Sequence, residues 1–105
     1  MMSEVHYTYG MWPVKPGKEA EFVEAWQALN EIFRALPNPP GPGQSILIQN
    51  VADPLMFCSL GPWRSSEDLA AMRANPQARA GIKRLEALCG KGVRGTYRLA
   101  ASAEV

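Results

Sequence analysis

Gly61-Pro62-Trp63-Arg64-Ser65-Ser66-Glu67-Asp68-Leu69 joins the dense apolar run of residues 55–60 to an amphipathic segment. Ser65 or Ser66 can accept a backbone N–H hydrogen bond at a helix start, and Asp68 lies three residues beyond Ser65. Glu67 and Asp68 then fall in the first helical turn, where the helix dipole favours anions. The pattern predicts a strand that ends at Trp63 and a helix that begins just after it.

The other strands are predicted from aromatic and β-branched residues. Residues 5–12 form a first strand that stops at Pro13, and residues 44–50 form a second one. Residues 55–63 are apolar on both faces, so the third strand needs cover on both sides. Residues 93–100 alternate between apolar and polar side chains, which is typical of a half-buried last strand.

The helices are predicted from apolar residues at helical spacing. In residues 18–36 the large apolar side chains recur every three or four positions, at Phe22, Trp26, Leu29, Phe33 and Leu36. The prolines and glycines of residues 37–43 end this helix. A second helix is broken at Asn75-Pro76 into residues 66–74 and 77–88, with Pro76 suited to the first turn of the second piece.

The order β-α-β-β-α-α-β predicts an α+β domain of the ferredoxin-like type, with a four-stranded antiparallel sheet and helices on one face only. The other face would carry one side of the third strand and residues such as Ile46, Ile48 or Leu47. Such a face is too apolar to remain in water. A second copy packed sheet to sheet would cover it, so we expect a homodimer.

Length and charge limit the functions that the chain can have. The 105 residues suffice for one domain, 1–105, with a core of about residues 5–99 and a loose tail at 101–105. Eleven basic and ten acidic residues nearly cancel, so no nucleic acid or anionic membrane is an expected partner. Because the N-terminal residues lack a basic segment and an apolar segment, we expect a cytoplasmic protein.

Cysteine and histidine usage argues against metal chemistry. Cys58 falls in a strand and Cys89 near a helix end, without CxxC spacing, so we expect two reduced, buried thiols rather than a disulfide. His6 is the single histidine, so no His/Cys metal site is expected. The glycines at 90, 92 and 95 formally match a dinucleotide fingerprint, but they follow a helix and open a strand, which is the reverse of the required context.

Trp63 is the first candidate for a functional side chain. It shares a strand face with Gly61, Ser59 and Phe57, because alternate residues of a strand project to the same side. On a face that meets the helices, Trp63 could offer its ring to a planar substrate and its indole N–H to a developing oxyanion. The alternative is a core tryptophan that holds the helix start in place.

Other candidates come from the remaining tryptophans and from the last helix. Trp12 is a plausible rim residue at the end of the first strand, whereas Trp26 belongs by default to the core stripe of the first helix. Lys83 and Arg79 lie four residues apart, and Arg73 precedes the helix break. A cation beside an aromatic pocket could stabilise a phenolate or an enolate, although charged residues on a helix flank are usually only solvated.

Three motifs in the expected order give the chain a resemblance to a known family. They are Val14-Lys15-Pro16-Gly17-Lys18 before the first helix, Trp63-x-Ser65-x-Glu67, and Asn75-Pro76 in the broken helix. Over residues 5–99 the chain resembles the antibiotic biosynthesis monooxygenase domain of the dimeric α+β barrel superfamily. The resemblance implies a dimeric α+β barrel and one of the family's activities: cofactor-free oxygenation of polyphenols, quinol oxygenation or haem degradation.

Departures from the family pattern narrow this choice. The haem-degrading branch uses an asparagine on the first strand and a histidine on the helix after the tryptophan motif, and these places fall near Gly10 and Gly81. Many quinol-type relatives carry a histidine after the helix break, where this chain has Gln77-Ala78-Arg79. We therefore expect no haem, no other cofactor and no histidine general base.

The leading hypothesis is a cofactor-free monooxygenase that acts on a small aromatic or quinol-type substrate. Trp63 is its candidate catalytic residue, and the candidate substrate-binding residues are Trp12, Trp26, Ser59, Phe57 and Lys83. The alternative is a non-catalytic homodimeric module of the same fold that binds a small hydrophobic or aromatic ligand. The lack of the family histidines favours the module, and the aromatic residues Trp12 and Trp63 favour the enzyme.

Overall fold

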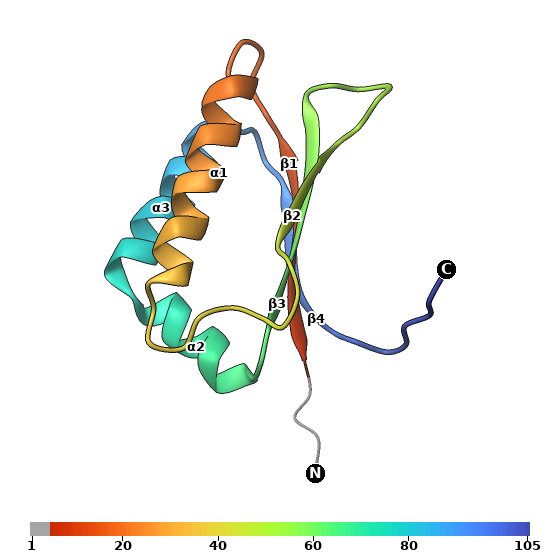
Figure 1. Ribbon diagram of the computed structural model, residues 1–105. Helices are drawn as coiled ribbons and strands as arrows, with labels where there is room; N and C mark the ends of the chain where they lie inside the picture. Colours follow the sequence, from red (N-terminus) through yellow and green to blue (C-terminus); the bar gives the residue numbers. More distant parts are fainter. Residues whose placement is uncertain (1–4) are drawn as a thin grey trace.

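Four strands and three helices follow one another in the computed structural model, which describes residues 5–105 (Figure 1). In chain order they are β1 (His6–Pro13), α1 (Glu19–Arg34), β2 (Ile46–Gln49), β3 (Met56–Trp63), α2 (Ser66–Ala74), α3 (Pro76–Ala87) and β4 (Val93–Arg98). The predicted order and the α+β class are confirmed. The bounds of α2 agree with the prediction, whereas α1 ends two residues before Leu36, ahead of the proline-rich loop.

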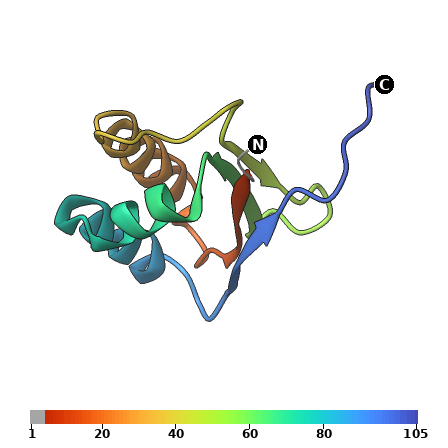
Figure 2. The same ribbon diagram turned by 90° about the horizontal axis from the view of Figure 1, so that it is seen from below.

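The sheet has the strand order β2-β3-β1-β4, and every neighbouring pair is antiparallel. All three helices cover one face of it, as the view along the strands shows (Figure 2). The central strands β1 and β3 pair over their whole length, from His6 with Trp63 to Pro13 with Met56. This register places the even residues of β1 and the odd residues of β3 on the same face of the sheet, toward the helices.

Side-chain caps explain why the second helix is broken where it is. Ser65 is the N-cap of α2, and its Oγ accepts a hydrogen bond from the Asp68 backbone N–H at 3.1 Å. Asn75 ends α2 and caps α3, because its Oδ1 accepts from the Ala78 backbone N–H at 3.0 Å. Pro76 occupies the first turn of α3, as predicted. The choice between Ser65 and Ser66 is therefore settled in favour of Ser65.

Replacing Ser65 with alanine should lower the free energy of unfolding by about 1 kcal/mol, because the Asp68 N–H loses its side-chain acceptor. Ser66→Ala is the matched control, since among residues 5–105 the Ser66 hydroxyl bonds only to the exposed Glu67 carboxylate. Urea unfolding followed by far-UV circular dichroism measures both changes. Equal midpoints for Ser65→Ala and the wild type would mean that the cap does not stabilise α2.

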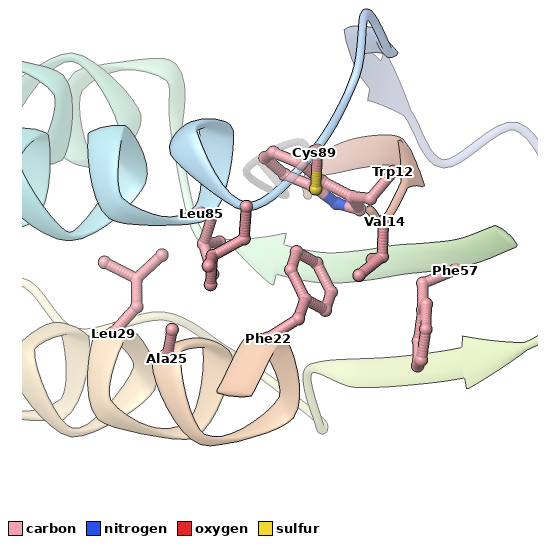
Figure 3. Packing of buried hydrophobic residues seen from close by; sticks show 9 residues of the cluster. Trp12, Val14, Phe22, Ala25, Leu29, Phe57, Leu85 and Cys89 are labelled. Carbon is pink, nitrogen blue, oxygen red and sulfur yellow. The ribbon is translucent and has the colours of Figure 1, made fainter. Parts of the chain in front are cut away.

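The core lies between the helices and the sheet and consists of two clusters. The larger one gathers around Phe22 of α1, which is fully buried and lies between Leu85 and Phe57 in Figure 3. The Phe22 ring centroid is 5.3 Å from that of Phe57 and 5.8 Å from that of Trp12. The smaller cluster consists of Trp63, Leu69, Met72 and Ala78. The two clusters meet at Phe33 and Ile82, which pack against both.

The sheet face that points away from the helices is apolar and open. Its exposed large side chains come from all strands except β1, namely Ile46, Ile48, Leu60, Val93 and Tyr97. Leu47, which the sequence offers as a further residue of this face, instead pairs with Ser59 and packs on the core. The chain after β4 runs away from the sheet on this same side (Figure 1).

The two cysteines are free thiols, as expected, but their surroundings differ. Cys89 is buried beside Trp12, and burial raises the pKa of its thiol. Cys58 is only half-buried, which corrects the expectation that both would be buried, because its side chain lies on the open face of the sheet. None of the helices within residues 5–105 is long and apolar enough to cross a lipid bilayer.

Candidate functional site

A cavity of about 470 Å³ lies between the helices and the sheet, and β1, β3, β4 and all three helices contribute to its lining. This volume is within the range of small-molecule sites. Five of the six residues predicted for the site line it: Trp63, Trp12, Trp26, Ser59 and Lys83. The topology brings them together, because β1 and β3 pair at the centre of the sheet while α1 and α3 lie above it.

The floor of the cavity is made of small side chains on β1 and β3. Thr8 pairs with Gly61, and Gly10 pairs with Ser59. Gly10 has no room for a side chain, because a Cβ there would lie 2.5 Å from the Trp12 Nε1 and 3.0 Å from the Ser59 Oγ. Because Gly10 and Gly61 have no side chains, the cavity has room above them for a ligand, and the Trp12 ring can lie against Gly10.

Trp12 forms one wall. It is 7% exposed, so it is a buried wall residue rather than the rim residue that the sequence suggested. Its indole N–H donates to the Ser59 Oγ at 2.9 Å, and the Arg94 guanidinium lies over its ring, 5.4 Å from the centroid. The N–H of Trp12 is thereby occupied, whereas the Ser59 hydroxyl keeps its own proton for a hydrogen bond into the cavity.

Trp63 lines the cavity and also belongs to the core. It is 1% exposed and packs in the smaller cluster, with the Phe33 ring edge-on at 5.2 Å between centroids. Its indole N–H has no hydrogen-bond partner in the part of the chain that the structure describes. No fully buried polar side-chain atom within residues 5–105 lacks a partner, so this nitrogen keeps some accessible surface. Trp63 thus holds the start of α2 in place and is left with an unused donor.

The helix α1 supplies a wall residue that the sequence predicted and one that it missed. Trp26 is half-buried and lines the cavity. Asn30, one turn later, also lines it, and its Nδ2 donates to the Trp26 backbone oxygen at 2.9 Å. The Asn30 side-chain oxygen is left to accept a hydrogen bond. A polar residue four positions after Trp26, on the apolar stripe of α1, is a signal that could have found it.

Phe57 does not line this cavity, which corrects its assignment to the substrate site. It lies on the predicted strand face, but near the start of β3, where its ring packs on Phe22 in the larger core cluster. Figure 3 shows Phe57 next to Phe22 and Val14, at the far side of Phe22 from Leu29. Residues of one strand face share a direction but spread along the strand, and Phe57 lies about 20 Å from Trp63 by the rise of about 3.3 Å per residue.

Charged side chains form the mouth of the cavity. Of the residues that line it, five are exposed, and all five are charged: Arg73, Arg79, Lys83, Glu86 and Arg94. Arg94 pairs with the Glu86 carboxylate, and Arg73 donates to the Thr96 hydroxyl. These two contacts link the helices to β4.

Gly10 and Gly81 stand at the two positions where the haem-degrading branch of the family has its asparagine and histidine, and both glycines are tightly packed. Gly10 lies against the Trp12 ring, and a Cβ on Gly81 would be 2.7 Å from the Leu29 Cδ1. Gly81 therefore lies close against α1, and a side chain there would have to displace the end of the Leu29 side chain. Within residues 5–105 no three His, Cys, Asp or Glu side chains are grouped to hold a metal ion.

Tyr9 borders the cavity from β1, but its side chain projects to the opposite face of the sheet. The Tyr9 hydroxyl lies 3.7 Å from the Cys58 sulfur, and this hydrogen bond raises the pKa of Tyr9. The Tyr9 ring also meets the Tyr97 ring edge-on on the open side of the sheet. His6 does not line the cavity.

Comparison with solved structures gives proteins of the same fold. A conserved protein of Methanosarcina mazei Go1 has a TM-score of 0.77 and 16% identity, over 91% of this chain and 93% of that one. SnoaB, a cofactor-independent oxygenase of Streptomyces nogalater, has in a variant form a TM-score of 0.80 and 17% identity, over 95% of this chain and 96% of that one. A protein of Shewanella oneidensis has a TM-score of 0.75 and 13% identity, over 92% of each chain.

Comparison with curated proteins gives no match. The sequence profile of the antibiotic biosynthesis monooxygenase family matches residues 6–84, from the start of β1 into α3, and thus covers the Trp63 motif and most of the cavity. The resemblance seen in the sequence and the observed fold agree with this match. The chain belongs to the antibiotic biosynthesis monooxygenase family.

Proposed function

We propose that this protein is a cofactor-free monooxygenase that acts on a small aromatic or quinol-type substrate in the cavity of each protomer. The observation that carries the proposal is the combination of aromatic walls with unused hydrogen-bond donors. Trp12, Trp26 and Trp63 surround a floor of small residues, the Ser59 O–H can donate into the space, and the Trp63 N–H has no partner among residues 5–105.

The reaction would begin from the deprotonated substrate. A phenolate or enolate is electron-rich enough to reduce dioxygen, and donors aimed at its oxygen stabilise that charge in a site with little water. In an anthrone-type substrate, one atom of dioxygen becomes a carbonyl oxygen in place of a CH₂ group, and the other leaves as water with its two hydrogens. Trp63 would bind the oxyanion, Ser59 would share this task, and Lys83 would add positive charge at the mouth.

A second candidate function is a non-catalytic module that binds a small aromatic ligand. One observation favours it: His6, the single histidine of the chain, does not line the cavity, so imidazole cannot act there as a general base near neutral pH. The cavity, its aromatic walls and its donors serve binding as well as catalysis.

Oxygen uptake with a panel of hydroquinones and anthrones separates the two functions. As an enzyme, the purified protein should accelerate uptake well above autoxidation, without added metal or flavin and without release of hydrogen peroxide on monooxygenation. Heat-treated protein is the control. Uptake at the autoxidation rate, from protein that still binds the same aromatics, would favour the binding module.

We also propose that two copies pack through their open sheet faces. Ile48 is 58% exposed and Tyr97 is 54% exposed on that face, and burial of such side chains stabilises association. Sedimentation equilibrium at micromolar concentration should give about twice the chain mass of 11.5 kDa. A single species at the chain mass would leave the apolar face without cover and would remove the barrel from the proposal.

A further inference from the structure

The mouth of the cavity has an excess of basic side chains over acidic ones. Four of its five residues are basic, namely Arg73, Arg79, Lys83 and Arg94, and Glu86 is the one acid. The whole chain is nearly neutral, with 11 basic and 10 acidic residues, so this concentration of cations is local. A local excess of one charge at a cavity mouth raises the local concentration of ligands of the opposite charge.

Two of the four cations already have partners. Arg94 pairs with Glu86 and stacks over Trp12, which uses the only acid of the mouth. Arg73 donates to the Thr96 hydroxyl of β4. These contacts engage two cations of the mouth and leave the other two, Arg79 and Lys83, which both belong to α3.

Arg79 and Lys83 are the unpaired cations. They stand four residues apart on α3, so they lie on the same helix face as neighbours. Neither makes an ion pair or hydrogen bond with another of residues 5–105. Two like charges at this spacing destabilise a helix slightly, and an anion between them would remove that repulsion. An arginine beside a lysine suits a carboxylate, which can accept two parallel N–H bonds from the guanidinium.

We propose that the ligand of this cavity is an aromatic carboxylic acid, whose ring system lies among Trp12, Trp26 and Trp63 and whose carboxylate binds Arg79 and Lys83 at the mouth. This inference rests on the proposed function for the location of the site, and it adds the substrate class. The carboxylate is ionised near neutral pH. It fixes the orientation of the ring, because one end of the ligand must remain at the charged mouth while the other reaches Trp63 and Ser59.

The test compares acids with their uncharged amides. The probes are 2,5-dihydroxybenzoic acid, 1,4-dihydroxy-2-naphthoic acid and anthracene-2-carboxylic acid, each with its primary amide. Tryptophan fluorescence quenching under nitrogen gives dissociation constants without turnover. For at least one ring size, the wild-type protein should bind the acid about tenfold more tightly than the amide, as expected for a charge-assisted hydrogen bond near the surface. Addition of salt should reduce this preference.

Variants test whether Arg79 and Lys83 cause the preference for acids over amides. Arg79→Gln and Lys83→Gln should each bring the ratio of acid to amide affinity close to one. Arg84→Gln is the matched control, because Arg84 is an exposed cation of the same helix that does not line the cavity, and it should keep the wild-type ratio. Equal affinity for acids and amides, an equal loss in Arg84→Gln, or no binding of any acid would overturn the proposal.

The result of the acid-binding test does not depend on the result of the oxygen-uptake test. Tight, Arg79-dependent acid binding with no oxygen uptake would uphold the carboxylate site and reject the oxygenase. Oxygen uptake with neutral quinols and no acid preference would uphold the oxygenase and reject the carboxylate site.

Discussion

Trp63→Phe should lower ligand affinity or turnover by roughly tenfold or more while the protein remains folded. The phenyl ring keeps an aromatic group against Phe33 but has no N–H. Loss of a hydrogen bond to a charged oxygen in a site with little water costs at least about 1.5 kcal/mol, which corresponds to about a tenfold change. Packing is also weakened, and the free energy of unfolding should fall by about 1 to 2 kcal/mol.

Met72→Leu is the matched control for this effect. Met72 is buried, lines the cavity and packs in the Trp63 cluster, and leucine nearly conserves its volume without removing a hydrogen-bond donor. Ligand binding and turnover are measured per folded molecule, with urea unfolding as the stability measurement. A clear loss of stability in Trp63→Phe with binding and turnover intact would identify Trp63 as a purely structural residue.

Gly10→Ala should lower the free energy of unfolding by about 2 to 3 kcal/mol and also impair the cavity. The new methyl group would lie 2.5 Å from the Trp12 Nε1 and 2.9 Å from its Cε2, so the ring must move. Trp12 is buried and cannot move without breaking its hydrogen bond to Ser59 or pushing on Phe22. The displaced ring would occupy part of the floor, so ligand affinity should fall with stability.

Gly90→Ala provides the comparison, because a Cβ at Gly90 would meet only Pro13 atoms, at 3.9 Å. Urea unfolding gives the free energy of unfolding of both variants, and near-UV circular dichroism reports the environment of the tryptophan rings. Similar stabilities and unchanged tryptophan signals in Gly10→Ala would mean that the floor has room that the structure does not indicate.

Most of the fold could be predicted because its signals are local. The apolar spacing of Phe22, Trp26, Leu29 and Phe33 places α1 without reference to any other element, since a helix with that stripe must bury one face. The break at Asn75-Pro76 has a local cause as well, since Asn75 caps α3 and proline fits its first turn. The bounds of β2 differ from the prediction, since only four of the seven predicted residues form the strand.

The site could be predicted only in part. Alternation along β3 correctly placed Ser59 and Trp63 on the helix side, but it also included Phe57, since alternation gives a direction and no position along the cavity. Asn30 was missed because a single polar residue in a helix is uninformative until the opposite wall is known. The rim assignment of Trp12 failed for a similar reason: a strand-end tryptophan is exposed or buried according to what packs on it, and here Arg94 and Phe22 do so.

The sequence by itself determined the order of elements, the break of the second helix at Asn75-Pro76 and the family, because these depend on neighbouring residues and on motif order. Only the tertiary structure decided which side chains surround the cavity and which remain unpaired. Arg79 and Lys83 look like any solvated helix residues until β4 is placed beside them, with Arg94 taking Glu86. Charge pairing and cavity shape depend on contacts between residues far apart in the chain, and such contacts exist only once the sheet and the helices have packed together.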